Sequence, residues 1–121
     1  MRSFKFAGNG VWLTLRTQHN AWIHALASLI VVGAGYFLGI SRNDWCIIIF
    51  ACAGVWIAES LNTAIEFVAD ATSKEFNPLI GKAKDVAAGA VLIAAIAAVI
   101  VGLLVFVPYL TALVASPLKH T

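Results

Sequence analysis

Three long apolar stretches constrain what this sequence can fold into more than any other feature. They run over residues 21–40, 45–69 and 86–107, and each holds at least the roughly 20 residues that a helix needs to cross the hydrocarbon core of a bilayer. Charged residues make up only 12% of the chain, about half of the roughly 25% that is usual in soluble domains. We therefore predict a single all-α integral membrane domain over residues 1–121 with three transmembrane helices.

The first segment, residues 3–18, has the pattern of an amphipathic helix that lies on the membrane surface. Its apolar side chains recur at helical spacing, and polar side chains occupy another face. The apolar set is Phe4, Ala7, Val11 and Leu15, and the polar set is Lys5, Asn9 and Arg16. Gly8 and Gly10 each weaken a helix by about 1 kcal/mol relative to Ala. Two interpretations follow: a loosely ordered start, or a place where a ligand approaches the backbone.

The segments between the apolar stretches are polar. Residues 41–44 (SRND) form a tight turn, and residues 70–85 (DATSKEFNPLIGKAKD) form a longer polar connection. Pro108 is expected to end the third span, because proline lacks the N–H group that continues a helix. This span is rich in alanine and glycine, and small residues let helix backbones approach closely in lipid. We therefore expect it to pack inside a bundle.

The distribution of Lys and Arg predicts the orientation of the chain. Three of these residues lie in the N-terminal segment and three in the 70–85 connection, whereas the 41–44 turn holds one. Because cytoplasmic loops carry the excess of Lys and Arg, the N-terminus and the connection should face the cytoplasm, although Lys119 in the outer tail opposes this. The net charge of +2, without a basic stripe, argues against binding to nucleic acid.

The end of the second span, AESLNTAIEFVAD, carries a polar stripe. At about 100° per residue, its polar side chains fall on one face of the helix. The stripe consists of Glu59, Asn62, Thr63, Glu66 and Asp70. A carboxylate facing lipid at mid-bilayer costs about 3 kcal/mol or more, so this face must turn toward other helices or a wet cavity. Mg²⁺ is bound by carboxylates together with phosphate oxygens and water, and a carboxylate can serve as a general base.

The polar stripe taken alone leaves other functions open. It could be a polar seam in a structural helix bundle, or a relay in a small proton-coupled transporter. In GKAKD, Lys84 could contact phosphates, and Asp85 could hold a metal or a nucleotide hydroxyl. Alternatively, this pair of charges could only mark the start of a helix. His19 and His24 could be metal ligands, but we interpret His24 as an interfacial histidine. The chain has neither a P-loop motif nor a GxGxxG motif, so a nucleotide site would differ from the common ones.

Three stretches of the sequence resemble a known family. They are AESLNTAIEFVAD, GKAKDVAAGAVLIAAIAAVIVGL and, more loosely, GVWLTLRTQHNAWIH. Together they cover most of the chain, from about residue 10 to residue 108, and they contain the pattern ExxNxxxExxxD followed by AKD. The sequence is similar in these features to the small bacterial membrane kinases that comprise diacylglycerol kinase and undecaprenol kinase.

The resemblance implies transfer of the γ-phosphoryl group of MgATP to a lipid alcohol at the cytoplasmic face of the bacterial inner membrane. By position, Glu59 matches the catalytic base, Asn62 the residue that supports it, and Glu66 the metal-binding glutamate. The implied ATP contacts are Glu66, Asp70, Glu75, Phe76, Asn77, Lys84 and Asp85. The implied lipid contacts are Gly10, Glu59 and Ala88. Family members are homotrimers whose active sites are shared between subunits.

The sequence departs from the family pattern at one position and leans toward one branch. Where the family commonly has a second metal-binding glutamate, this chain has Gln18, whose amide offers an oxygen but no charge. The segments QHNAWIH and GLLVFVPYL resemble the undecaprenol kinase branch of the family. Undecaprenol is therefore the expected acceptor, and diacylglycerol is the alternative.

Overall fold

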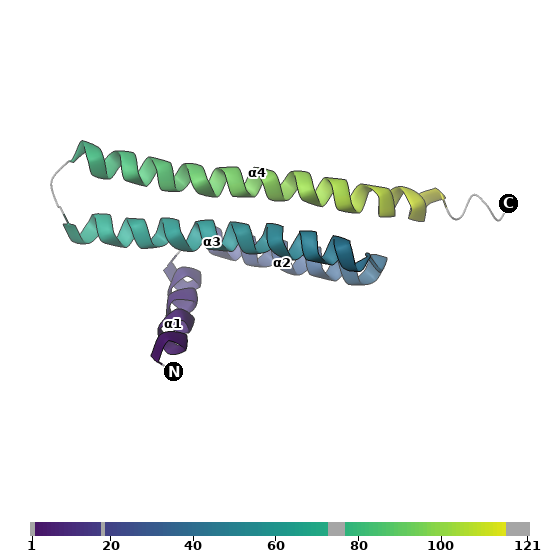
Figure 1. Ribbon diagram of the computed structural model, residues 1–121, viewed down its shortest axis with the longest axis horizontal. Coiled ribbons are helices and arrows are strands. Elements are labelled where there is room, and N and C mark those ends of the chain that lie inside the picture. Colours follow the sequence, from purple (N-terminus) through teal and green to yellow (C-terminus); the bar gives the residue numbers. More distant parts are fainter. Residues whose placement is uncertain (1, 18, 73–76, 116–121) are drawn as a thin grey trace.

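Four helices make up the part of the chain that the structure describes (Figure 1). The structure is a computed structural model and describes residues 2–17, 19–72 and 77–115. The helices are α1 (Arg2–Thr17), α2 (His19–Leu38), α3 (Arg42–Thr72) and α4 (Pro78–Ala115). The last three are long and apolar enough to cross a membrane. The all-α membrane architecture predicted from the sequence is confirmed.

The three long helices lie alongside one another, and α1 points away from them (Figure 1). α3 and α4 run antiparallel and form the most extensive contact between any two helices. α2 also packs on both but less closely, and α1 touches α2 and α3. This arrangement leaves α1 free to lie on a membrane surface while the other helices cross it.

The polar connection between the second and third spans is shorter than the sequence suggested. We predicted a connection over residues 70–85, but α3 continues to Thr72 and α4 already begins at Pro78. Proline suits the first position of a helix, where its missing N–H is not needed. Asn77 caps the helix, because its Oδ1 accepts a hydrogen bond of 2.9 Å from the Leu79 amide. Lys84 and Asp85 consequently lie on a helix and not in a loop.

The turn between α2 and α3 is fixed by backbone conformation and by a cap. Gly39 has a φ of 63°, a left-handed conformation that glycine adopts without strain and that commonly ends a helix. The Ile40 amide then bonds back to the Gly35 carbonyl at 3.2 Å. Ser41 begins the next helix by accepting a hydrogen bond of 3.2 Å from the Asp44 amide through its Oγ. The turn therefore lies at residues 39–41 and not at 41–44 as predicted, because Arg42, Asn43 and Asp44 already belong to α3.

Pro108 does not end the third span, contrary to the prediction. α4 continues through it to Ala115. Within a membrane, neighbouring groups can compensate for the backbone bond that proline removes. Here the next residue provides a tertiary link, because the Tyr109 hydroxyl donates to Asp44 Oδ2 at 2.6 Å and accepts from the Ser41 amide at 3.0 Å. These two bonds tie α4 to the α2–α3 turn and favour the continued helix.

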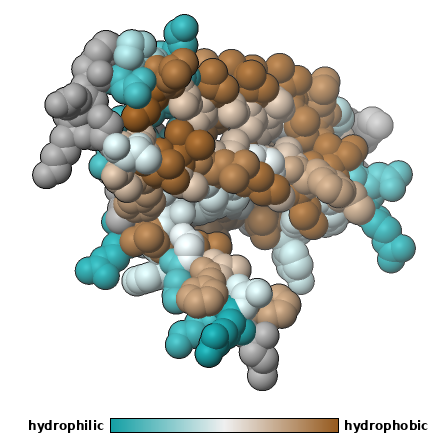
Figure 2. Space-filling view, turned by 60° about the vertical axis from the view of Figure 1, so that its left-hand side comes forward, coloured by the Kyte–Doolittle hydropathy of each residue, from teal (hydrophilic) through white to brown (hydrophobic). Residues whose placement is uncertain are grey.

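The sides of the bundle are apolar, and polar side chains gather toward its ends and on α1 (Figure 2). In the described chain, the buried apolar cluster contains only Ile40, Ile48 and Val105. Large side chains such as Phe37 and Phe50 are exposed, and most of α4 is exposed although the sequence suggested burial inside a bundle. An apolar surface of this extent fits contact with lipid or with another chain.

We predict that Tyr109→Phe lowers the stability of the folded chain by about 1–2 kcal/mol, because it removes two hydrogen bonds, one of them to a carboxylate. Equilibrium unfolding in mixed micelles of increasing denaturing detergent would measure the change. Tyr36→Phe is the matched control, since Tyr36 is 85% exposed and should tolerate the loss of its hydroxyl. Equal midpoints for the wild type and Tyr109→Phe would contradict the assigned role of Tyr109.

Candidate active site

Glu59 lies at the inner end of the polar stripe and is buried inside the bundle. Only 1% of the residue is exposed, and it has the largest fully buried side chain among the described residues. The face of α3 that holds it also buries Ile48, Val55 and Thr63, at the spacing expected for one side of a helix. The deep part of the polar stripe therefore faces other helices, as predicted from the cost of exposing a carboxylate to lipid.

His24 of α2 lies against this carboxylate. Its Nε2 is 3.5 Å from Glu59 Oε2. Close by, Trp56 Nε1 donates a hydrogen bond of 3.2 Å to Ser28 Oγ, so a second polar pair joins the same two helices. His24 precedes Ser28 by one turn, whereas Glu59 follows Trp56 by about one turn, as antiparallel helices require. The two contacts together set the register of α2 against α3.

Exposure of the three carboxylates in the polar stripe increases from Glu59 toward the end of α3, whereas Thr63 is buried. Asn62 and Glu66 are half-buried, and Asp70 is exposed. The Asn62 Nδ2 donates to Glu66 Oε1 at 3.5 Å, the limit of a hydrogen bond, so the amide steadies the neighbouring carboxylate. Asp70 lies eleven residues beyond Glu59, which corresponds to about 16 Å along a helix. The stripe thus leads from an exposed end inward to a buried carboxylate.

The remaining predicted site residues lie around this stripe or outside the described chain. Gly10 is exposed on α1, and its carbonyl accepts a hydrogen bond of 2.9 Å from the buried Thr14 hydroxyl. Asn77 is exposed and caps α4. Lys84, Asp85 and Ala88 are exposed on the first turns of α4. The predictions for Gln18, Glu75 and Phe76 fall outside the described residues.

A groove of about 460 Å³ lies between α3 and α4, beside the polar stripe. Asn62 lines it from α3 and Lys82 from α4. Lys84 and Asp85, in contrast, are not among its lining residues. Within one chain, the basic residue at this groove is therefore Lys82, and the Lys84–Asp85 pair is not brought to the buried end of the stripe.

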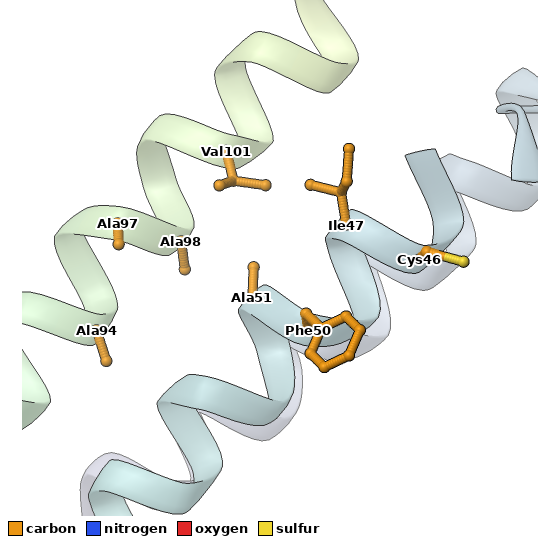
Figure 3. Close-up of a pocket in the computed structure, with 8 residues that line it drawn as sticks. All are labelled: Cys46, Ile47, Phe50, Ala51, Ala94, Ala97, Ala98 and Val101. Carbon is orange, nitrogen blue, oxygen red and sulfur yellow. The ribbon is translucent and has the colours of Figure 1, made fainter. Parts of the chain in front are cut away.

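Nearer the α2–α3 turn, α3 and α4 line an open pocket whose side chains are apolar apart from one cysteine (Figure 3). Its volume is about 410 Å³. Val101 and Ala98 point from α4 toward α3, and Ala51 and Ile47 point back. The lining includes the thiol of Cys46, which points away from α4 (Figure 3). The lining of this pocket is thus apolar, in contrast to the polar stripe at the other end of α3.

The donor set suits a magnesium ion that is shared with phosphate groups. Over the described ranges, no group of three or more His, Cys, Asp or Glu side chains could hold a metal ion. Mg²⁺ does not need such a cage, because it commonly takes one or two carboxylates and completes its shell with phosphate oxygens and water. Glu66, half-buried and steadied by Asn62, is placed to supply one carboxylate.

Sequence reasoning did not assign the contact of His24 with Glu59. We interpreted His24 as an interfacial histidine, whereas the structure places it against the deepest carboxylate. A signal was present in the spacing: His24 lies 17 residues before Ser41, and Glu59 lies 15 residues after Asp44. Two helices joined by a tight turn bring residues at similar distances from that turn side by side.

Comparison with known proteins identifies the class to which this arrangement belongs. The family model for prokaryotic diacylglycerol kinase matches residues 5–106. Undecaprenol kinase of Bacillus subtilis (strain 168) is 42% identical over 109 residues, which cover 90% of this chain and 89% of that protein. Diacylglycerol kinase of Synechocystis is 41% identical over 112 residues, covering 92% and 64% of the two chains. Diacylglycerol kinase of Escherichia coli (strain K12) is 38% identical over 106 residues, covering 82% and 84%.

The three apolar helices and these relatives define an integral-membrane lipid kinase, a phosphotransferase that acts on an alcohol group. The transporter and structural-bundle interpretations are therefore set aside. The chain belongs to the prokaryotic diacylglycerol kinase family, which confirms the resemblance noted in the sequence.

Proposed function

We propose that this lipid kinase transfers the γ-phosphoryl group of MgATP to undecaprenol, with Glu59 as the general base. The observation that carries the proposed mechanism is the buried carboxylate of Glu59 at the inner end of a polar stripe. The undecaprenol kinase of Bacillus subtilis, which matches along nearly the full length of both chains, supports the choice of acceptor. Diacylglycerol is the second candidate, because two of the relatives carry that name.

The proposed reaction assigns a separate task to each part of the polar stripe. As the lipid hydroxyl oxygen attacks the γ-phosphorus, Glu59 accepts the hydroxyl proton. The new bond joins that oxygen to phosphorus, and the bond from phosphorus to the bridging oxygen of ADP breaks. Phosphoryl transfer depends chiefly on in-line positioning and on charge neutralisation. Asn62 contributes to positioning by steadying Glu66.

Glu66 is the proposed protein ligand of magnesium. When bound, the ion neutralises charge that develops on the phosphate oxygens. Gln18 would add a neutral oxygen where the family commonly has a carboxylate, so Glu66 supplies the negative charge. The expected contacts to the rest of the nucleotide are Asp70, Glu75, Phe76, Asn77, Lys84 and Asp85.

We further propose that the active enzyme is a homotrimer with sites shared between subunits. Lys84 and Asp85 are exposed and do not line the groove beside Asn62 within one chain. A neighbouring subunit that packs on the exposed apolar flank would bring such a pair to the polar stripe. The extensive apolar surface along the long helices supports such packing.

The proposed topology places the active site at the cytoplasmic face of the bacterial inner membrane. The N-terminus and the α3–α4 connection, which carry most of the Lys and Arg residues, face the cytoplasm, and the C-terminus lies outside. The exposed end of the stripe at Asp70 then meets cytoplasmic ATP. The lipid approaches within the bilayer, with Gly10 and Ala88 as expected contacts near Glu59.

Purified enzyme in micelles should phosphorylate undecaprenol faster than diacylglycerol by about tenfold or more in kcat/KM, because the site would discriminate through contacts with the chain that carries the hydroxyl. Radiolabelled ATP and extraction of the lipid product would measure both rates side by side. A faster rate on diacylglycerol would reverse the proposed specificity and leave the kinase assignment intact.

Glu59→Gln should lower kcat by at least about 100-fold, since removal of a general base typically costs this much or more. The substitution keeps size and hydrogen-bonding capacity, so binding of ATP and thermal stability should change little. Asp44→Asn is the control, because it also neutralises a carboxylate on α3 but lies at the opposite end of the helix. Undiminished turnover in Glu59→Gln would remove Glu59 from its proposed role.

Glu66→Gln should raise the Mg²⁺ concentration for half-maximal activity by at least about tenfold, since even indirect ligand contacts can be worth that much in metal affinity. Glu66→Asp, which keeps the charge, should fall between this variant and the wild type. Binding of Mn²⁺ with ADP, followed by electron paramagnetic resonance, would report the same order without turnover. Identical metal titrations for all three proteins would contradict the assignment.

A further inference from the structure

The carboxylate of Glu59 is buried with one oxygen left without a hydrogen bond. Among the described residues, Glu59 Oε2 is the buried side-chain oxygen that has no hydrogen-bond partner. A buried polar group in this state is costly and rare in folded proteins, and a catalytic role is one of the explanations for it. The nearby polar group recorded for this oxygen is His24 Nε2, at 3.5 Å.

The position of His24 is held by contacts independent of Glu59. The Trp56–Ser28 hydrogen bond fixes α2 against α3 within one turn of the pair. Val55, on the same face of α3, is buried, and together with His24 and Ser28 it lines a groove of about 480 Å³ between the three long helices. The His24 side chain is 20% exposed while Glu59 is enclosed. The imidazole thus lies between the buried carboxylate and the open part of the groove.

We infer that His24 is a positioning residue, which holds Glu59 Oε2 so that the other carboxylate oxygen is presented to the acceptor hydroxyl. This inference rests on the proposed role of Glu59 as the base. A carboxylate on a flexible side chain can rotate, and a misplacement of about 1 Å in a reacting group can cost about 100-fold in rate. A partner on one oxygen limits that rotation without occupying the other.

The gap of 3.5 Å is at the outer limit for a hydrogen bond. The contact therefore acts through charge and dipole attraction and through steric confinement of the carboxylate. A side chain of similar shape without an N–H group would preserve the confinement and lose the attraction. A side chain that keeps a donor at the same reach would preserve both in part. If His24 acts by positioning, the variant that keeps a donor should be more active than the variant that keeps only the shape; if it acts by packing alone, the two should be equally active.

The test compares His24→Leu, His24→Gln and Ser28→Ala for kcat, for KM of MgATP and for thermal stability in micelles. His24→Leu should lower kcat by about 10- to 100-fold, with KM for MgATP changed by less than about threefold, because ground-state nucleotide binding is unaffected. His24→Gln, which retains an N–H donor, should recover at least about a third of the wild-type kcat. Ser28→Ala removes the neighbouring interhelical bond and should change stability more than kcat.

A coupling measurement makes the inference specific to Glu59. In a Glu59→Asp background the carboxylate is withdrawn by one methylene and the contact with His24 is already broken. His24→Leu should then lower kcat by no more than about twofold, against 10-fold or more in the wild type. Equal losses in both backgrounds, or a kcat for His24→Gln no better than for His24→Leu, would overturn the positioning role. If His24→Leu does not fold, His24→Phe takes its place in the same comparisons.

The outcomes also separate this inference from the proposed function. Full activity of Glu59→Gln would overturn the role of Glu59 as base, and the inference about His24 with it. Loss of activity in Glu59→Gln together with wild-type kcat in His24→Leu would overturn the role of His24 alone. Loss in both, with recovery in His24→Gln and coupling to Glu59→Asp, is the result expected.

Discussion

The burial of Glu59 is the constraint on which the rest of the structure depends. A carboxylate in the middle of an apolar helix is costly in hydrocarbon, so the helix that carries it must be covered on that face. α2 provides part of this cover and places His24 against the carboxylate, while the other faces of α3 remain apolar. The arrangement of the long helices therefore follows from the need to enclose one charged group while exposing its neighbours progressively along the stripe.

The opposite end of the bundle is organised by polar contacts of a different kind. Gly39 ends α2 in a left-handed conformation, and Ser41 caps α3. The Tyr109 hydroxyl of α4 bonds to Ser41 and to Asp44. These contacts satisfy backbone groups that would otherwise be unpaired in or near lipid. These contacts anchor α3 and α4 at one end, and a groove lined by Asn62 and Lys82 lies between the same helices toward the other end.

A single chain brings together the polar side chains of α3 but does not join Lys84 and Asp85 of α4 to them. Glu59, Asn62 and Glu66 come from one helix and are fixed relative to each other by its geometry. Lys84 and Asp85 are exposed on α4 and do not join them within the chain. The large apolar flanks and this separation both fit a site completed by a second copy.

The sequence by itself determined the number and type of helices, the amphipathic first helix and the shared face of the polar stripe. These features follow from local periodicity, composition and caps, which act over one or a few helical turns. α4 begins earlier than predicted because Asn77 caps it. It also continues past Pro108, where a bond from the Tyr109 hydroxyl to Asp44, 65 residues away in the chain, outweighs the local effect of proline. Only the tertiary structure decided that His24 meets Glu59 and that Lys84 does not line the groove beside the stripe. Such contacts depend on the register and rotation of packed helices, which are set by many weak interactions between distant segments and leave no local pattern in the chain.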